Sequence, residues 1–164
     1  MLAAALGANA NPASTVILRH NGNMTVFEAD SLTAAIDRAV DGDTILLSKG
    51  SFKGLTLTKR ITVRGEGQET HVLGDVTIKL ADSLMTQTAL EGLHIGGVNS
   101  GYNEYYDNSI TVSSPTVNLA IRQCRFSTIT LSDLARGRGH DNVQIDRCLV
   151  TGDFKFGGSV RSMT

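Results

Sequence analysis

The feature that most constrains the fold is a short pattern that occurs twice within residues 119–150. It has the form apolar-x-Ile-x-x-Cys-x-apolar, with Ile121 and Cys124 in the first copy and Ile145 and Cys148 in the second. The two cysteines lie 24 residues apart, a period typical of chains that stack repeated units. Apolar and polar residues alternate on both sides of a two-residue break, which indicates two short strands joined by a tight bend. The pattern predicts one part of a coil in a parallel β-helix.

Looser copies near Leu90 and Ile61 extend the pattern toward the N-terminus, and a third short strand precedes each pair. The fold class we expect is therefore all-β, a right-handed parallel β-helix (β-solenoid) of about four coils. The third strands are predicted at Leu55-Thr56-Leu57, Val76-Thr77-Ile78, Ile110-Thr111-Val112, Ile129-Thr130-Leu131 and Phe154-Lys155-Phe156.

Composition agrees with one domain of short strands. The chain has 164 residues with 17 glycines, 2 prolines and no tryptophan, which suits strands and tight bends better than a helical bundle. A net charge of −1 gives no bulk electrostatic argument for nucleic acid as a partner. No apolar run reaches about eighteen residues, so we expect no insertion into a membrane. We place the single domain at residues 15–164.

Residues 1–14 are alanine-rich and contain Ala8-Asn9-Ala10, which matches the small-x-small cleavage site of a secretory signal. The basic segment that normally precedes such a site is missing, so a disordered N-terminal segment is the alternative. On the signal interpretation the protein is secreted or lies at the cell surface.

One amphipathic helix is predicted over residues 31–40, with Asp30 or Ser31 as its N-cap and Gly42 after its end. Placed before the first coil, it would cap the N-terminal end of the core. Weak alternation within residues 15–27 predicts a first hairpin or an incomplete coil. The apolar face of the helix comprises Leu32, Ala35, Ile36, Ala39 and Val40.

Residues 31–76 resemble the opening segment of a known family. After the helix come Gly42-Asp43-Thr44-Ile45, Gly50-Ser51-Phe52, a strand led by Lys59 and the turn Gly65-Glu66-Gly67. This order is similar to that of pectate-lyase-like right-handed β-helix proteins. The resemblance is close over this segment and rests on periodicity beyond it. It implies the fold much more directly than any reaction, and in enzymes of this fold the substrate cleft lies along a strand face.

Aligning the third strands places polar residues in one outward column, which comprises Thr56, Thr77, Thr111, Thr130 and Lys155. Beside it run Gly54, Asp75, Ser109, Thr128 and Asp153 on one side and Thr58, Lys79, Ser113, Ser132 and Gly157 on the other. Threonine suits an exposed strand by propensity alone. A flat face of hydroxyls, with Asp75 and Lys79 at its borders, also suits a repeating ligand such as a polysaccharide.

A polar insertion over residues 96–108 carries all three tyrosines, Tyr102, Tyr105 and Tyr106. Clustered aromatic side chains in a long loop on a rigid scaffold are candidate ligand contacts. The alternative is that the tyrosines pack onto the wall of the fold.

A second outward column, with alternating charge, contains Arg64, Glu91, Arg122 and Asp146. Alternation stabilises in-register stacking, so we expect these residues to be structural. Cys124 and Cys148 should also stack, about 4.8 Å apart. We interpret them as two unreactive buried thiols, with a disulfide as the alternative and no zinc site.

Candidate catalytic residues come from a resemblance to pectin methylesterases. Gly152-Asp153-Phe154-Lys155-Phe156-Gly157 resembles their Asp-Phe-Ile-Phe-Gly motif, and Ser132-Asp133-Leu134 faintly resembles Gln-Asp-Thr-Leu. The resemblance implies Asp153 and Asp133 as nucleophile and acid/base, with Arg161 as the available arginine, although the two aspartates do not share a column. The Arg-x-Pro-x-x-Arg arrangement of some lyases and the Asn-Thr-Asp and Asp-Asp pairs of galacturonan hydrolases are missing.

The main functional hypothesis is a secreted domain that binds or acts on an extracellular polysaccharide along the threonine column. The alternatives are a non-catalytic surface or adhesin-type module and a pectin-methylesterase-like carbohydrate esterase. We expect no cofactor, except Ca²⁺ if the protein is a lyase. Few residues follow Phe156, so we also expect an uncovered C-terminal end that continues into further coils or self-associates.

Overall fold

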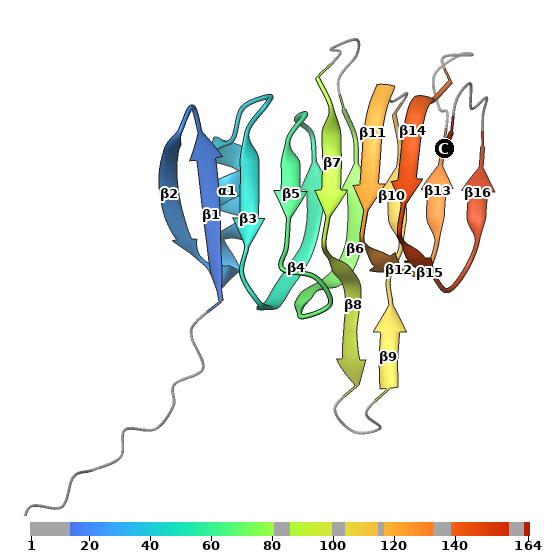
Figure 1. Ribbon diagram of the computed structural model, residues 1–164, viewed down its shortest axis with the longest axis horizontal. Coiled ribbons are helices and arrows are strands. Elements are labelled where there is room, and N and C mark those ends of the chain that lie inside the picture. Colours follow the sequence, from blue (N-terminus) through green and yellow to red (C-terminus); the bar gives the residue numbers. More distant parts are fainter. Residues whose placement is uncertain (1–13, 81–85, 100–103, 115–116, 133–138, 158–162) are drawn as a thin grey trace, which may run out of the picture.

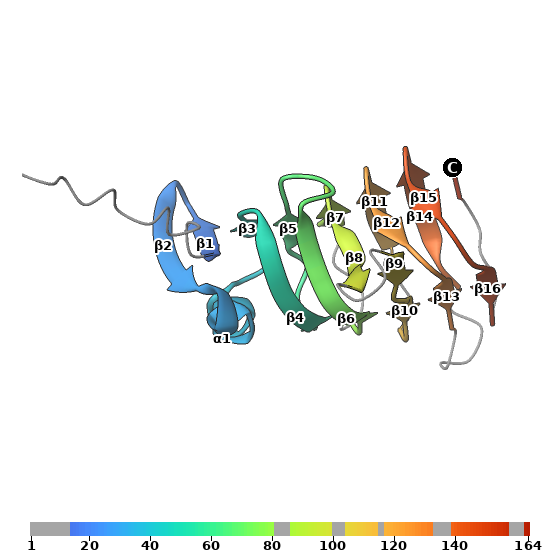
Figure 2. The same ribbon diagram turned by 90° about the horizontal axis from the view of Figure 1, so that it is seen from below.

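The computed structural model describes residues 14–80, 86–99, 104–114, 117–132, 139–157 and 163–164. Figure 1 shows the strands side by side along the long axis, from β2 at one end to β16 at the other. Seen from below, they form two layers of sheet (Figure 2). No helix in these described ranges is long and apolar enough to cross a membrane.

The first sheet is mixed and has the strand order β14-β11-β7-β5-β3-β1-β2. Neighbours from β3 to β14 are parallel, whereas β1 is antiparallel to both β2 and β3. The β1–β2 hairpin turns at Asn21 and Gly22, whose φ angles of 47° and 83° suit a two-residue turn. The strands are β1 (Thr15–His20), β2 (Asn23–Glu28), β3 (Thr44–Leu47), β5 (Thr62–Arg64), β7 (Thr88–Glu91), β11 (Val117–Arg122) and β14 (Asp141–Asp146).

The second sheet is branched, because its long strands β4 and β6 bend. The first half of β6 pairs with β8 and the second half with β10, and the β4–β6 register shifts between Lys53 and Leu55. A Cβ atom on Gly74 would lie 3.1 Å from the Gly54 Cα, so the bend needs glycine there. The strands are β4 (Gly50–Leu57), β6 (Thr70–Ile78), β8 (His94–Asn99), β9 (Glu104–Asp107), β10 (Ile110–Val112), β12 (Arg125–Phe126), β13 (Ile129–Leu131), β15 (Leu149–Val150) and β16 (Phe154–Phe156).

The predicted right-handed parallel β-helix of about four coils is wrong as the fold class. The strands form one mixed sheet and one largely parallel, branched sheet, with antiparallel pairs at β1–β2, β1–β3 and β8–β9. The physical reason is that side chains alternate with a period of two in every strand, whether its neighbour is parallel or antiparallel. Periodicity therefore predicted the all-β content and many of the residue pairs that lie side by side on adjacent strands. It did not predict strand direction or sheet organisation.

The predicted helix is confirmed in a shorter form. The 3-10 helix η1 (Ala29–Ser31) leads into α1 (Leu32–Arg38), and Ala39 is already extended. Nζ of Lys59 donates hydrogen bonds to the carbonyl oxygens of Ile36, Asp37 and Ala39 at 3.2, 2.5 and 2.7 Å, which satisfies the C-terminal end of the helix. Figure 2 shows α1 beside β4 in the layer of the second sheet, opposite β1. The helix thus covers the first sheet, and β1 and β2 lie at the N-terminal end with it.

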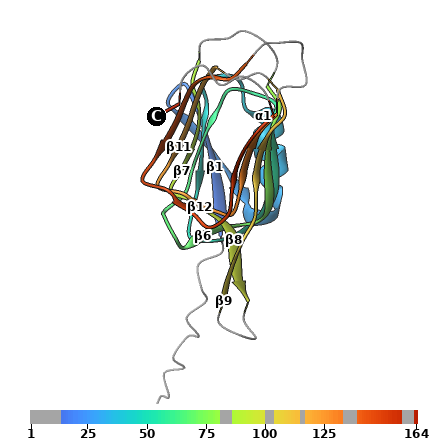
Figure 3. The same cartoon turned by 90° about the vertical axis from the view of Figure 1, so that its right-hand side faces the viewer.

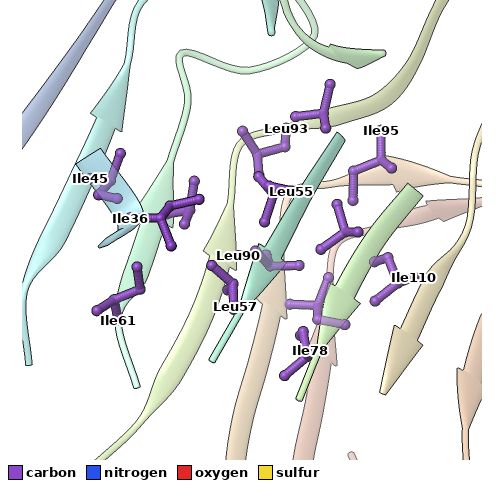
Figure 4. Packing of buried hydrophobic residues seen from close by; sticks show 14 of the residues in the cluster. Ile36, Ile45, Leu55, Leu57, Ile61, Ile78, Leu90, Leu93, Ile95 and Ile110 are labelled. Carbon is purple, nitrogen blue, oxygen red and sulfur yellow. The ribbon is translucent and has the colours of Figure 1, made fainter. Parts of the chain in front are cut away.

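A continuous apolar core fills the space between the layers (Figure 4). Ile45 and Leu90 come from the first sheet, Ile61 lies directly before β5, and Leu57 and Ile78 come from the second sheet; all five are fully buried. Leu57 and Ile78 each lie between two polar residues that are exposed or partly exposed, as expected for strands with one buried face. The core therefore leaves two outward strand surfaces and one projecting hairpin for function.

Candidate functional site

The threonine column is confirmed in full. Thr56 is paired with Thr77, Thr77 with Thr111, Thr111 with Thr130 and Thr130 with Lys155. Neighbouring strands lie about 4.8 Å apart, so the side chains repeat at that spacing across β4, β6, β10, β13 and β16. Thr56 is exposed and the other threonines are partly exposed. We call the outward surface of these four threonines the threonine face.

The flanking columns also follow the predicted register. On one side the backbone N–H of Ile129 donates to the Asp153 carbonyl oxygen, and Asp75 Oδ1 accepts a 2.8 Å hydrogen bond from the Ser109 N–H. On the other side the Lys79 N–H donates to the Leu57 carbonyl oxygen. Because its carboxylate is used to hold β10, Asp75 has a structural role. Lys79 and Asp153 remain exposed at the borders of the threonine face.

The predicted polar insertion folds into a hairpin of β8 and β9 that projects below the two layers (Figure 3). Tyr105 and Tyr106 on β9 are 55% and 44% exposed. The ring of Tyr105 lies against His94 and under the Arg125 guanidinium, with the Arg125 Cζ 4.6 Å from the ring centroid. The packing alternative therefore holds for Tyr105, which still presents part of its ring to solvent, whereas contact with a ligand stays a prediction. Tyr102 lies outside the described residues.

A polar cluster beneath this hairpin was missed by the sequence reasoning. His71 on β6, His94 on β8 and Arg125 on β12 occupy one column of neighbouring strands. Because β9 runs back antiparallel to β8, it brings Asp107 close to His94. The distance from His94 Nε2 to Asp107 Oδ1 is 2.8 Å, and the distance from His94 Nδ1 to His71 Nδ1 is 3.0 Å. His94 is fully buried, whereas His71 is partly exposed. We call these four residues the His-Asp cluster.

Asp107 is held as a carboxylate by several donors. Arg125 donates from Nε to Oδ1 at 2.8 Å and from Nη2 to Oδ2 at 3.2 Å, and the Thr151 hydroxyl donates to Oδ2 at 2.8 Å. Burial raises the pKa of Asp107, but the hydrogen bonds from Arg125, Thr151 and His94 outweigh it, so the pKa lies below its usual value. Conversely, the hydrogen bond to Asp107 raises the pKa of Arg125. The pair is therefore ionised at neutral pH.

The hydrogen-bond chain assigns the histidine tautomers. An ionised Asp107 only accepts, so Nε2 of His94 carries the hydrogen, and Nδ1 of neutral His94 then accepts one from Nδ1 of His71. This leaves a lone pair on Nε2 of His71, on the far side of its ring. Burial, followed by the proximity of His94, lowers the pKa of His71 and favours this neutral form, while Glu69 opposes the shift.

Gly96 makes this arrangement sterically possible. Its φ angle is +142°, and a Cβ atom there would lie 2.1 Å from the Tyr106 carbonyl oxygen and 3.0 Å from His94 Nε2. Two sequence signals point weakly toward the cluster: the glycine pair at the start of the insertion and the spacing of 23 residues between His71 and His94, close to the repeat period.

The charge column is confirmed in register, with Arg64, Glu91, Arg122 and Asp146 on successive strands. Glu91 contacts Arg64 at 2.6 Å and Arg122 at 3.0 Å. Burial raises the pKa of Glu91, but the two arginines outweigh it and lower the pKa. Asp146 instead contacts Arg147 at 2.9 Å. Three members of the column therefore form an ion network, which supports a structural role.

Cys124 and Cys148 are free thiols at equivalent positions, in the bends that join β11 to β12 and β14 to β15, so the predicted pairing of positions is confirmed. The prediction that both are buried is wrong, because Cys148 lies at the last layer and is partly exposed. The contact between the thiols raises the pKa of Cys124, with burial adding to it, and lowers the pKa of Cys148 to about 7. Cys148 is therefore the reactive thiol of the pair.

The predicted catalytic set stays a prediction, because only Asp153 of its three members lies among the described residues. Asp153 is exposed just before β16, and its N–H donates to Thr128 Oγ1 at 3.3 Å. Asp133 and Arg161 lie outside the described residues. Among the residues that are described, no group of three or more His, Cys, Asp or Glu side chains is arranged to hold a metal ion.

Comparison of the chain with protein-family models, curated proteins and solved structures gave no match.

Proposed function

We propose that the protein binds an extended extracellular polysaccharide along the threonine face. The observation that supports this most directly is the register of Thr56, Thr77, Thr111 and Thr130 on four neighbouring strands. Their spacing of about 4.8 Å is similar to the length of one sugar unit in an extended glycan. A chain that lies across the strands can therefore repeat the same contacts from one strand to the next.

The chemistry of the face suits hydroxyl-rich ligands. Within the described residues, no hydrogen bond to another protein group occupies the four threonine hydroxyls, so each can donate to and accept from a sugar. Lys79 and Lys155 add exposed positive charge at its border, which favours glycans that carry carboxylates. This proposal includes a location outside the cytoplasm, where such polymers occur.

The projecting hairpin supplies a second type of contact. Tyr105 and Tyr106 keep about half of their surface exposed, and aromatic rings with a polar tip suit the apolar faces of sugars. Tyr105 is held in place by Arg125 and His94, so little side-chain entropy remains to be lost on binding.

The test is a glycan-array screen of the purified protein, followed by calorimetric titration of the glycans that bind. The variant T77V/T111V removes two hydroxyls from the face and keeps β-branched side chains. The matched control, T44V/T62V, changes two partly exposed threonines that are neighbours on the first sheet. Loss of two hydrogen bonds of about 0.5–1.5 kcal/mol each should weaken binding by about 5- to 150-fold, with the control unchanged. Equal effects of the two variants, or the absence of any bound glycan, would refute the proposal.

A further inference from the structure

We propose that Nε2 of His71 is the general base of a hydrolytic site that activates water against small acyl esters, with His94 and Asp107 as positioning residues. This goes beyond polysaccharide binding and does not depend on it. The proposal stands on the chain of contacts from Asp107 Oδ1 through His94 to His71, at 2.8 and 3.0 Å. The Asp107 end of this series of contacts is buried and ionised, and the His71 end reaches the surface.

The buried part of the chain is fixed. His94 is fully buried, has both ring nitrogens engaged and lies against the Tyr105 ring at 5.4 Å between centroids. Asp107 is held by Arg125 and Thr151. Neither group can rotate without losing a buried hydrogen bond, so the hydrogen bond from His94 fixes the orientation of the His71 ring.

The same contacts hold His71 in the tautomer that a base needs, with the Nδ1 hydrogen donated to His94 and Nε2 left to accept a proton. When Nε2 accepts a proton, the imidazolium becomes a stronger donor at Nδ1 toward His94, which in turn donates to the Asp107 carboxylate. Besides His94, the charged group that acts on His71 is Glu69, which forms an ion pair with Lys49. A base that is neutral near pH 7 and backed by a carboxylate has the properties that general-base catalysis needs.

His20, elsewhere in the protein, is a histidine with a carboxylate partner that lacks the features of His71. Its Nδ1 lies 2.7 Å from Asp43 Oδ1, so it also has a carboxylate partner, and its side chain is 47% exposed. Its Nε2, however, lies 3.0 Å from the Asn21 amide nitrogen and accepts a hydrogen bond there. The lone pair of His20 is occupied, whereas that of His71 faces no partner among the described residues.

The proposed reaction is the hydrolysis of an ester by water. His71 Nε2 takes a proton from water as the water oxygen bonds to the ester carbonyl carbon. The tetrahedral intermediate then collapses, the bond to the alcohol oxygen breaks, and His71 returns the proton to that oxygen. Ester and water give carboxylic acid and alcohol, and the imidazole is regenerated.

The experiment uses the full chain and p-nitrophenyl acetate as the probe, with release of p-nitrophenol followed from pH 5 to 9. The variant H71Q should lose the protein-dependent rate by about 100-fold or to the buffer level, whereas the control H20Q should keep it. Retention of the rate in H71Q, or equal loss in both variants, would overturn the proposal. So would a wild-type rate no greater than that of free imidazole at the same concentration.

A second measurement on the unaltered protein does not depend on the folding of any variant. Brief treatment with diethyl pyrocarbonate should modify His71 before His20 and His94, as mapped by peptide mass spectrometry, and should abolish hydrolysis. Hydroxylamine, which removes the group, should restore it. Modification of His20 before His71, or full activity after His71 has reacted, would contradict the proposal.

Replacing Asp107 by Asn tests the positioning role. It should move the pH midpoint of hydrolysis downward, because the protonated imidazole of His71 loses the support of the carboxylate. An unmoved midpoint in a folded variant would exclude the positioning role.

Discussion

Replacement of Asp107 by Ala tests how strongly the His-Asp cluster holds the projecting hairpin to the sheets. The carboxylate side chain is 5% exposed and receives hydrogen bonds from Arg125, Thr151 and His94. The change leaves the Arg125 guanidinium, only 18% exposed, without its counter-ion. It also leaves Nε2 of His94 without an acceptor in a fully buried position.

The expected loss of stability is about 3–5 kcal/mol, the range for removing one partner of a buried ion pair. With a urea slope of about 2 kcal/mol per molar, the lower figure corresponds to a fall of about 1.5 M in the unfolding midpoint. Because the pKa of Asp107 is lowered in the folded state, its contribution is present above the pKa of the unfolded state. It is lost as pH falls through the folded-state pKa. The variant should therefore differ most from wild type near neutral pH and least in acid.

The assay is urea unfolding followed by circular dichroism at pH 7 and at pH 3. The matched control is D146A, which removes an exposed carboxylate whose ion pair, among the described residues, is with the exposed Arg147. It should change stability by less than about 1 kcal/mol. A D107A midpoint no lower than that of D146A would refute the view that the buried carboxylate anchors the hairpin. A deficit that is equally large at both pH values would refute the linkage argument.

Three further predictions concern other parts of the chain. Reversing Glu91 to Lys should destabilise the protein by about 1 kcal/mol or more, since three cations would then lie on neighbouring strands, and high salt should reduce the effect; a salt-independent loss would contradict this. In native protein, iodoacetamide should label Cys148 with a rate that rises through pH 7 and label Cys124 only after denaturation; equal labelling would exclude the assigned exposure. Phe154 and Phe156 are 43% and 48% exposed on the edge strand β16, so light scattering should show self-association that F154S/F156S reduces; a dilution-stable wild-type monomer would argue against it.

The positions of neighbouring residues in the parallel strands were largely decided by the sequence. Thr56, Thr77, Thr111 and Thr130 sit between apolar residues that must face the core, so a shift by one residue would expose every apolar side chain. The same requirement aligns Arg64 with Glu91. Local alternation and a repeated spacing therefore sufficed to predict both outward columns and the pairing of the two cysteine positions.

Strand direction, sheet number and the His-Asp cluster were decided only by the tertiary structure. Alternation is the same in parallel and antiparallel strands, so it could not predict that β1 pairs antiparallel to β3. Asp107 reaches His94 only because β9 folds back over Gly96, and Arg125 completes the cluster from another strand. Such contacts depend on the path of a hairpin and on the order of strands in a sheet. They therefore arise from long-range packing, which a residue-by-residue pattern does not contain.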